Sequence, residues 1–267
     1  MTQSGERNGF RVRLPSPGLL PIGVVVGLLA TWELLARAGL LPAVLFSSPT
    51  TVIRTLAATL RSGEMVGHVL ATLSRMIPGL LLGAIPGLLL GLAMGWSSAL
   101  RRALDPILMA VHPIPKIAIL PLLMIFLGIG EASRIAVASV AAFFPVLINT
   151  MAGVRQINSI YFDVAENYGA SRFKLFTRVI LPGSLPLTLS GLRLAANVTL
   201  LVTIAAEIVM ADRGLGSLVW LAWETLRVEL LYATLIVVSL LGISISTGLH
   251  RLHRSLVPWQ TEQRPVR

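Results

Sequence analysis

The sequence predicts an all-α polytopic membrane protein with six transmembrane helices. Of its 267 residues, 55% are hydrophobic and only 13% are charged, which leaves too little polar surface to cover a water-soluble domain. The mean hydropathy is +0.81, and several charge-free stretches reach the length of about 20 residues that a helix needs to cross the hydrocarbon core. These stretches are continuous rather than alternating, which disfavours a membrane β-barrel.

Charged residues set the limits of the predicted spans, because a charge at the bilayer centre costs about 2.5 to 3.5 kcal/mol. Five stretches are long enough to cross. A sixth is interrupted by a lysine and three prolines, so we expect a span with a broken middle. The predicted spans are Leu14–Trp32, Met76–Leu100, Pro106–Gly130 (the broken one), Ile135–Val154, Leu194–Ala211 and Leu230–Leu249.

The distribution of basic residues predicts the orientation. The formal net charge is +10, which in a soluble chain would suggest nucleic acid but in a membrane chain reports loop topology. Six spans put both termini on one side, and the segments of that side hold twice as many Lys and Arg as the opposite side. We therefore expect cytoplasmic tails at residues 1–13 and 251–267, a transmembrane domain at residues 14–250, and no nucleic-acid partner.

The first outer loop is predicted to run from Arg37 to Arg75. It contains the helix-start signal Ser47-Ser48-Pro49-Thr50 before Val52–Leu60, so a short helix at the outer membrane surface is expected.

The second predicted span carries five glycines at intervals of four residues, which places them on one helical face. Such a row lets a neighbouring helix approach closely. We interpret it as a packing surface, with gating by sliding along the groove as the alternative. The glycines are Gly79, Gly83, Gly87, Gly91 and Gly95.

Residues 155–193 are too many for a simple connection between two spans. Within them Ser159–Tyr168 is expected to form a short helix, Gly169 to provide a break with positive φ, and Ser171 to cap a second helix that runs to Val179. The dipeptide Leu181-Pro182 is expected to end that second helix.

The second helix of this loop carries an apolar stripe of Phe173, Phe176 and Val179 or Ile180 between basic residues. Such a stripe needs a groove to occupy, or it lies flat against anionic lipid headgroups.

These residues resemble the EAA loop in permease subunits of ABC importers. That pattern is Glu-Ala-Ala, three residues, Gly, nine residues, Ile, one residue and Leu-Pro. Here Asp163-Val164-Ala165, Gly169 and Val179-Ile180-Leu181-Pro182 have the same spacing with conservative replacements. Further segments are similar to the nitrate, aliphatic-sulfonate and taurine branch of the family. They are His112–Leu122, Gly128–Glu131, Ala205–Glu207 and Arg213–Gly216.

The resemblance implies a type I ABC importer permease fold in a bacterial inner membrane, with the loop of residues 155–193 docked on a separate ATP-hydrolysing subunit. It implies two permease copies, two ATPase subunits and an external solute-binding protein that docks near Arg54–Glu64 and Asp212–Glu229. The ATPase-coupling residues carried over are Asp163, Val164, Ala165, Gly169, Ser171, Phe173, Leu181 and Pro182.

The chain lacks the G-x-x-x-x-G-K-[ST] phosphate loop, so ATP and Mg are expected in the partner ATPase. We assign no catalytic, cofactor-binding or metal residue and expect a transport subunit rather than an enzyme. The solute is expected to be a small anion such as nitrate, bicarbonate, a sulfonate or taurine, while neutral vitamin precursors remain open.

Polar groups inside spans are the candidates for the translocation pathway, because burying them demands a partner or a wet cavity. They are Lys116, Asn149, Asn197, Thr199, Thr203 and Glu207. The threonines have an alternative role in bonding their own helix. A bare Glu207 in an anion route is implausible, so we expect it to be neutralised by Lys116 or Arg134, or to lie away from the route.

Two other functions are disfavoured by the sequence. An ion-coupled secondary transporter needs coupling carboxylates near the midplane and usually a paired repeat. Only Glu207 qualifies, and the two halves show no evident repeat. A membrane enzyme or passive scaffold is disfavoured by the absence of a catalytic constellation and by the spacing of the EAA loop.

Overall fold

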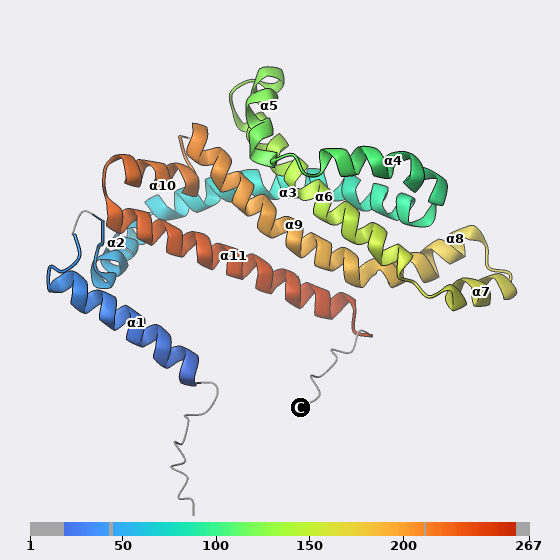
Figure 1. Ribbon diagram of the computed structural model, residues 1–267, viewed down its shortest axis with the longest axis horizontal. Coiled ribbons are helices and arrows are strands. Elements are labelled where there is room, and N and C mark those ends of the chain that lie inside the picture. Colours follow the sequence, from blue (N-terminus) through green and yellow to red (C-terminus); the bar gives the residue numbers. More distant parts are fainter. Residues whose placement is uncertain (1–18, 43–44, 211, 260–267) are drawn as a thin grey trace, which may run out of the picture.

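A computed structural model describes residues 19–42, 45–210 and 212–259, and this part of the chain is built from helices (Figure 1). The predicted tail 1–13, the start of the first predicted span and residues 260–267 lie outside the described residues. The elements are α1 (Leu19–Arg37), α2 (Pro49–Arg61), α3 (Glu64–Trp96), α4 (Ser98–Val111), η1 (Lys116–Ile119), α5 (Leu120–Leu127), α6 (Glu131–Arg155), α7 (Ser159–Asn167), α8 (Arg172–Leu175), η2 (Phe176–Ile180), α9 (Leu181–Met210), α10 (Leu215–Glu224) and α11 (Val228–Leu256).

The centre of the molecule is formed by α3, α6 and α9, with α11 running alongside (Figure 1). α6 packs against both α3 and α9, and it carries fully buried residues along its length, among them Val137, Ala142 and Leu147. α7 and α8 lie at one end of this bundle, and α2 and α10 lie at the other.

The five glycines of α3 face α6, which confirms the packing interpretation. A Cβ added at Gly79 would lie 2.6 Å from the Ala138 Cβ, and one at Gly87 would lie 2.7 Å from the Phe143 carbonyl oxygen. At Gly83 it would collide with the backbone carbonyl of Ser139. The two backbones approach so closely that no larger side chain fits between them.

Four helices among the described residues are long and apolar enough to cross a membrane, and the bent pair α4 and η1–α5 raises the number to five. This agrees with a polytopic all-α protein. α3 begins at Glu64, before the predicted span start at Met76, and Arg75 lies inside this helix. α9 likewise begins at Leu181, before the predicted start of the fifth span at Leu194. Paired charges are tolerated inside a membrane helix, so the helix can be longer than its charge-free stretch.

The broken span has the predicted interruption. α4 and the segment Lys116–Leu127 are bent by 87° relative to each other, at a break of four residues that contains Pro113 and Pro115. The Lys116 ammonium group donates hydrogen bonds to the carbonyl oxygens of His112 and Ile114, the latter at 2.8 Å. α5 consequently projects from the body of the molecule (Figure 1).

The predicted short helix of the first loop is α2. Ser48 is its N-cap, with its hydroxyl accepting from the Thr51 amide, and Pro49 is its first residue. α1 is attached to α2 through Glu33, which accepts from the Thr50 amide at 3.0 Å and from the Thr50 hydroxyl at 2.8 Å.

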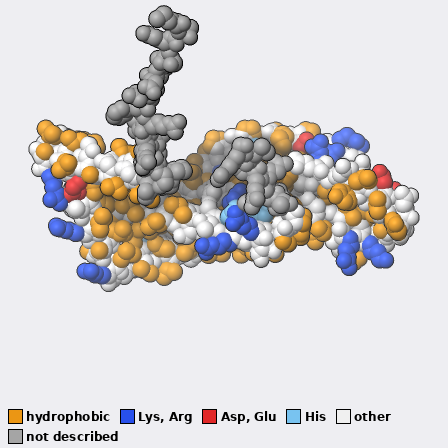
Figure 2. Space-filling model, turned by 90° about the horizontal axis from the view of Figure 1, so that it is seen from below, with side chains coloured by type: hydrophobic (Ala, Val, Ile, Leu, Met, Phe, Trp, Pro, Cys, Tyr) orange, Lys and Arg blue, Asp and Glu red, His pale blue; other side chains and the backbone are white. Residues whose placement is uncertain are grey.

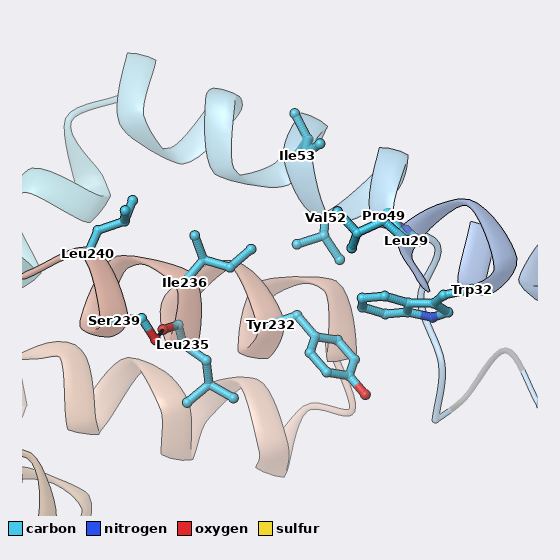
Figure 3. Close-up of a pocket in the computed structure, with 10 residues that line it drawn as sticks. All are labelled: Leu29, Trp32, Pro49, Val52, Ile53, Tyr232, Leu235, Ile236, Ser239 and Leu240. Carbon is cyan, nitrogen blue, oxygen red and sulfur yellow. Dashed lines mark hydrogen bonds between the residues drawn. The ribbon is translucent and has the colours of Figure 1, made fainter. Parts of the chain in front are cut away.

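An apolar groove separates α1 and α2 from α11 (Figure 3). Trp32 and Tyr232 meet edge to face at its end, with ring centroids 5.4 Å apart. Most of its other lining residues are aliphatic, so the groove suits lipid rather than a charged solute.

Candidate functional site

The predicted pair of short helices in the loop of residues 155–193 is present. Asn158 caps α7, with its side-chain oxygen accepting from the Ile160 amide at 3.0 Å. Ser171 caps α8, as predicted, by accepting from the Lys174 amide at 3.4 Å. Both caps satisfy amides that would otherwise have no partner in an isolated short helix.

Gly169 makes the turn between α7 and α8. Its φ is +66°, a conformation that costs other residues about 1 to 2 kcal/mol. The turn is closed by the Ala170 amide, which donates to the Ala165 carbonyl at 2.9 Å. A Cβ at Gly169 would meet no atom within 4 Å, so glycine is required here by the backbone and not by space.

The prediction that Leu181-Pro182 ends the second helix was wrong. After α8 the helix widens into the π-turn η2, in which the Leu181 amide bonds to the Phe176 carbonyl, and then continues as α9. In a regular α-helix the Pro182 ring would clash with the carbonyl four residues earlier. The extra residue of the wide turn removes that conflict, so the loop and the membrane helix form one continuous helix.

The surface of this helical pair exposes apolar side chains. Phe173 is 76% exposed and Tyr168 is 87% exposed, while Val164 and Asp163 are exposed on α7. Figure 2 shows basic side chains beside apolar ones at this end of the molecule, and further basic side chains at the opposite end. Exposed aromatic residues rimmed by charges are typical of a surface that binds another protein.

The other side of the pair is fixed to the bundle. The residues of the predicted apolar stripe do not all face the same surroundings. Phe176 stacks on Trp96, with ring centroids 5.6 Å apart, whereas Phe173 is exposed. Ile180 is fully buried with Leu92 of α3 and Val154 of α6. A force on the exposed face therefore reaches α3, α6 and α9 directly.

The predicted pathway residues do not form one cluster. Thr199, Thr203 and Glu207 share a helical face, as expected, but all three are buried inside the bundle. Thr199 donates to the Ala195 carbonyl of its own helix at 2.7 Å. Asn197 lies on the opposite, exposed face of α9 and accepts from the Ser246 hydroxyl at 3.0 Å.

Two further candidates lie near α6. Asn149 is half-buried, donates to the Pro145 carbonyl at 2.8 Å and packs against Gly191 of α9. Lys116 lies at the break between α4 and α5, with its ammonium nitrogen 4.6 Å from the centre of the Phe144 ring. An ammonium group has three N–H donors, and two of them are used at the break.

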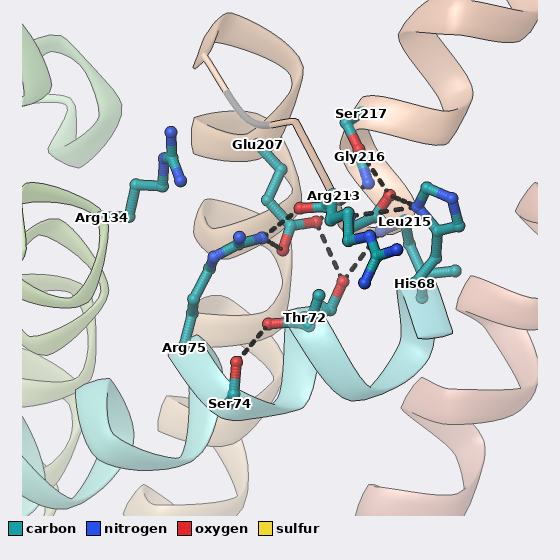
Figure 4. Close-up of polar contacts among 12 residues, drawn as sticks. His68, Thr72, Ser74, Arg75, Arg134, Glu207, Arg213, Leu215, Gly216 and Ser217 are labelled. Carbon is teal, nitrogen blue, oxygen red and sulfur yellow. Dashed lines mark hydrogen bonds and ion pairs between the residues drawn. The ribbon is translucent and has the colours of Figure 1, made fainter. Parts of the chain in front are cut away.

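Glu207 is fully buried in a polar cluster at the end of the bundle remote from α7 and α8 (Figure 4). Its carboxylate accepts from Arg75 at 2.7 Å, from the Thr72 hydroxyl at 2.9 Å and from the Gly216 amide at 3.0 Å. Its partner is thus Arg75, and not Lys116 or Arg134 as expected.

The same guanidinium group binds Glu131 at the start of α6. Arg75 donates through Nε at 2.6 Å and through a terminal nitrogen at 2.8 Å, and Arg134 donates to the same carboxylate at 2.8 Å. The two arginines and two glutamates make the cluster neutral overall. Charged side chains such as Arg75 and Glu207 are buried in proteins only when they are paired in this way.

Arg75 and Thr72 were missed because Arg75 was placed in a loop. A signal was present in the sequence: the glycine row of α3 has a step of four residues, and one step before Gly79 is Arg75. On a continuous helix Arg75 must face the same partner helices as the glycines.

Comparisons with known proteins show the family and the fold of the chain. The family described as "binding-protein-dependent transport system inner membrane component" matches residues 83–261. The taurine transport system permease protein TauC of Escherichia coli (strain K12) is 35% identical over 91% of this chain and 90% of its own length. The putative aliphatic sulfonates transport permease protein SsuC of Bacillus subtilis (strain 168) is 31% identical over 91% and 87%.

The fold is also similar to a solved structure. A chain of the MetNI methionine ABC transporter in an inward-facing conformation superimposes with a TM-score of 0.62, at 18% identity, over 72% of this chain and 95% of that chain.

Proposed function

Because this chain belongs to the family of inner membrane components of binding-protein-dependent transport systems, we propose that it forms, with a second copy of itself, the route by which a small sulfonate enters a bacterial cell. It is a membrane-spanning permease subunit of an ABC importer. Such a permease works with an ATPase and a binding protein.

The α7–α8 pair is the proposed ATPase docking site, and its geometry is the single observation that carries the proposal. It exposes Val164, Tyr168 and Phe173 on one side and is anchored to three membrane helices on the other. We place ATP and Mg in two partner ATPase subunits, since the chain has no phosphate loop. This assignment puts the loop and both termini in the cytoplasm.

A second copy of the chain is proposed to pack against α5. This helix projects from the bundle and exposes Ile125 and Phe126, and Ile129 follows it with a similar exposure. A projecting apolar helix at a sharp bend needs a protein partner, because the polar backbone groups freed at the bend are tolerated in a membrane only where protein or a wet cavity covers them.

Lys116 is the proposed solute-binding group of the pathway. A sulfonate is a permanent anion, and the ammonium group keeps one N–H donor beyond the two that hold the bend. Taurine and aliphatic sulfonates, named for the two relatives, share this sulfonate group. Glu207 is proposed to be structural. Four further residues stay proposed pathway residues with less support than Lys116: Asn149, Asn197, Thr199 and Thr203.

Two equally exposed phenylalanines allow a matched test of both interfaces. Phe173 is 76% exposed on α8 and Phe126 is 75% exposed on α5. Phe173→Ser is expected to abolish co-purification of the ATPase while the permease alone keeps the mass of a dimer in detergent. Phe126→Ser is expected to reduce that mass to a monomer. Normal ATPase binding and ATP-driven uptake by Phe173→Ser would contradict the docking site.

Lys116 is tested by ATP-driven uptake of radiolabelled taurine into proteoliposomes that contain the ATPase and the binding protein. Lys116→Ala is expected to lower the uptake rate at least tenfold, and Lys116→Arg to retain most of it, because arginine keeps the charge and a free donor. Uptake by Lys116→Ala at the normal rate and affinity would remove its pathway role.

The ion-coupled secondary transporter is not favoured. The matched family and relatives belong to binding-protein-dependent systems, and Glu207, its one candidate coupling carboxylate, is held by Arg75. Uptake driven by an ion gradient without ATP would restore this alternative.

A further inference from the structure

One guanidinium group connects three separate segments at the end of the bundle that carries α2 and α10. Arg75 of α3 donates to Glu207 of α9 and to the backbone carbonyl of Arg213 in the turn between α9 and α10 (Figure 4). It also donates to Glu131 of α6. Each of these segments is thereby fixed relative to α3.

Thr72 extends the connection to the start of α10. Its hydroxyl donates to Glu207 at 2.9 Å and accepts from the Leu215 amide at 2.9 Å, so both functions of a hydroxyl are used. His68, one turn earlier on α3, contacts the Gly214 carbonyl at 2.8 Å. The turn itself lies directly against the carboxylate, since a Cβ added at Gly214 would collide with the carboxylate atoms of Glu207.

α10 begins at this cluster and presents an aromatic surface. Leu215, Leu218 and Ala222 are buried against the bundle, whereas Trp220 and Trp223 are exposed, with their rings 4.8 Å apart. The helix that carries this surface, α10, is therefore attached at its N-terminus to the polar cluster. Through that cluster it is connected to α3 and α9.

We propose that Arg75, Thr72 and Glu207 are positioning residues that link α10 to α3 and α9, so that docking of the solute-binding protein on α10 is transmitted to the membrane helices. This inference rests on the proposed function, because it requires a binding protein on this side. A buried, charge-paired junction moves as one body, because separating its members leaves an unpaired charge in an apolar interior.

The junction is not equally strong toward every helix. The Glu207 side chain has no exposed surface, whereas the Glu131 side chain is 55% exposed. Water screens and replaces the Arg75–Glu131 pair far more easily than the Arg75–Glu207 pair. The Arg75–Glu207 pair therefore contributes more to holding α3, α9 and α10 together than the Arg75–Glu131 pair contributes to holding α6.

The test measures ATP hydrolysis by the permease–ATPase complex in nanodiscs while the taurine-loaded binding protein is titrated. Thr72→Val removes the hydroxyl at nearly constant volume. We expect unchanged basal hydrolysis and an unchanged concentration for half-maximal stimulation, but a maximal stimulation lowered about fivefold or more, the lower end of energetic coupling between linked sites. A loss of docking alone would instead raise the half-maximal concentration, which would overturn the proposal.

Thr234→Val is the matched control. Thr234 is equally buried, but its hydroxyl bonds only the Leu230 carbonyl of its own helix. This variant is expected to behave as the wild type, and Thr72→Ser is expected to restore stimulation because it keeps both hydrogen bonds.

Glu207→Gln offers a second variant if Thr72→Val assembles poorly, and it is expected to show the same selective loss of maximal stimulation. Equal losses in Thr72→Val and Thr234→Val would overturn the proposal, as would full stimulation in both Thr72→Val and Glu207→Gln. A wild-type complex that no binding protein stimulates would overturn the proposed function together with this inference.

Discussion

The α3–α6 interface and the α7–α8 turn both depend on glycine, but for opposite physical reasons. In the interface the glycines are helical, and a Cβ at Gly83 or Gly91 would run into backbone atoms of α6. In the turn Gly169 is surrounded by open space, yet its φ of +66° disfavours any other residue. One region needs the absence of a side chain, and the other needs the freedom of the backbone.

The difference separates a rigid part of the molecule from an adaptable one. Close backbone packing along a whole helix leaves no path for α3 to slide past α6, so the sliding alternative for the glycine row is disfavoured. The α7–α8 pair exposes Val164, Tyr168 and Phe173, the surface proposed to bind the ATPase. Substitutions in the first region should affect folding, and substitutions in the second should affect assembly.

Gly83→Val is expected to have the largest effect. Its side chain would overlap the Ser139 carbonyl and the Ala142 methyl group, so α3 and α6 must move apart at a cost of at least about 3 kcal/mol. We expect no monodisperse protein by size-exclusion chromatography in detergent. The control is Gly67→Ala on the same helix, where nothing lies within 4 Å; it should raise the melting temperature slightly. A normal elution profile for Gly83→Val would contradict the tight interface.

Glu207→Ala should come next, because it leaves Arg75 buried without its internal partner and costs about 3 to 5 kcal/mol. Glu131→Ala breaks the half-exposed pair and should cost about 1 kcal/mol or less. Thermal unfolding of both variants in the same detergent checks the ranking, and equal melting temperatures would refute the contrast between the two pairs.

Gly169→Ala should lower stability by about 1 to 2 kcal/mol, the strain of a left-handed alanine, without any steric clash. Because the strain can be relieved by rearranging the exposed turn, we expect near-normal membrane insertion but weaker ATPase binding, measured by titration of the ATPase. Loss of folding similar to that of Gly83→Val would erase the distinction between the two glycine roles.

Phe173→Ser should change stability least, within about 0.5 kcal/mol, because the side chain is exposed. A large drop in melting temperature for the permease alone would show that Phe173 packs within its own chain.

Features that depend on a few neighbouring residues could be predicted from the sequence. The caps at Ser48 and Ser171, the positive φ at Gly169 and the glycine face of α3 all follow from local chemistry or from a short period. The roles of the ATPase-coupling and pathway residues stay predictions.

Features that depend on distant partners could not be predicted in the same way. Arg75 looked like the end of a loop because its two carboxylate partners are 56 and 132 residues away in sequence. Pro182 looked like a helix end because a proline in a regular α-helix disrupts it, and only the π-turn before it allows the helix to continue. Both errors came from treating a residue as isolated when its surroundings compensate for it.

The π-turn also fixes the direction in which the docking face points. Each residue of an α-helix turns the chain by about 100°, so the one extra residue in Phe176–Ile180 sets the rotation of α8 about the axis that it shares with α9. Deleting a single residue there would let the helix close into regular turns while rotating Phe173 by about a quarter of a circle or more. The number of residues in this short stretch, more than their identity, sets the direction in which the proposed ATPase-docking surface faces.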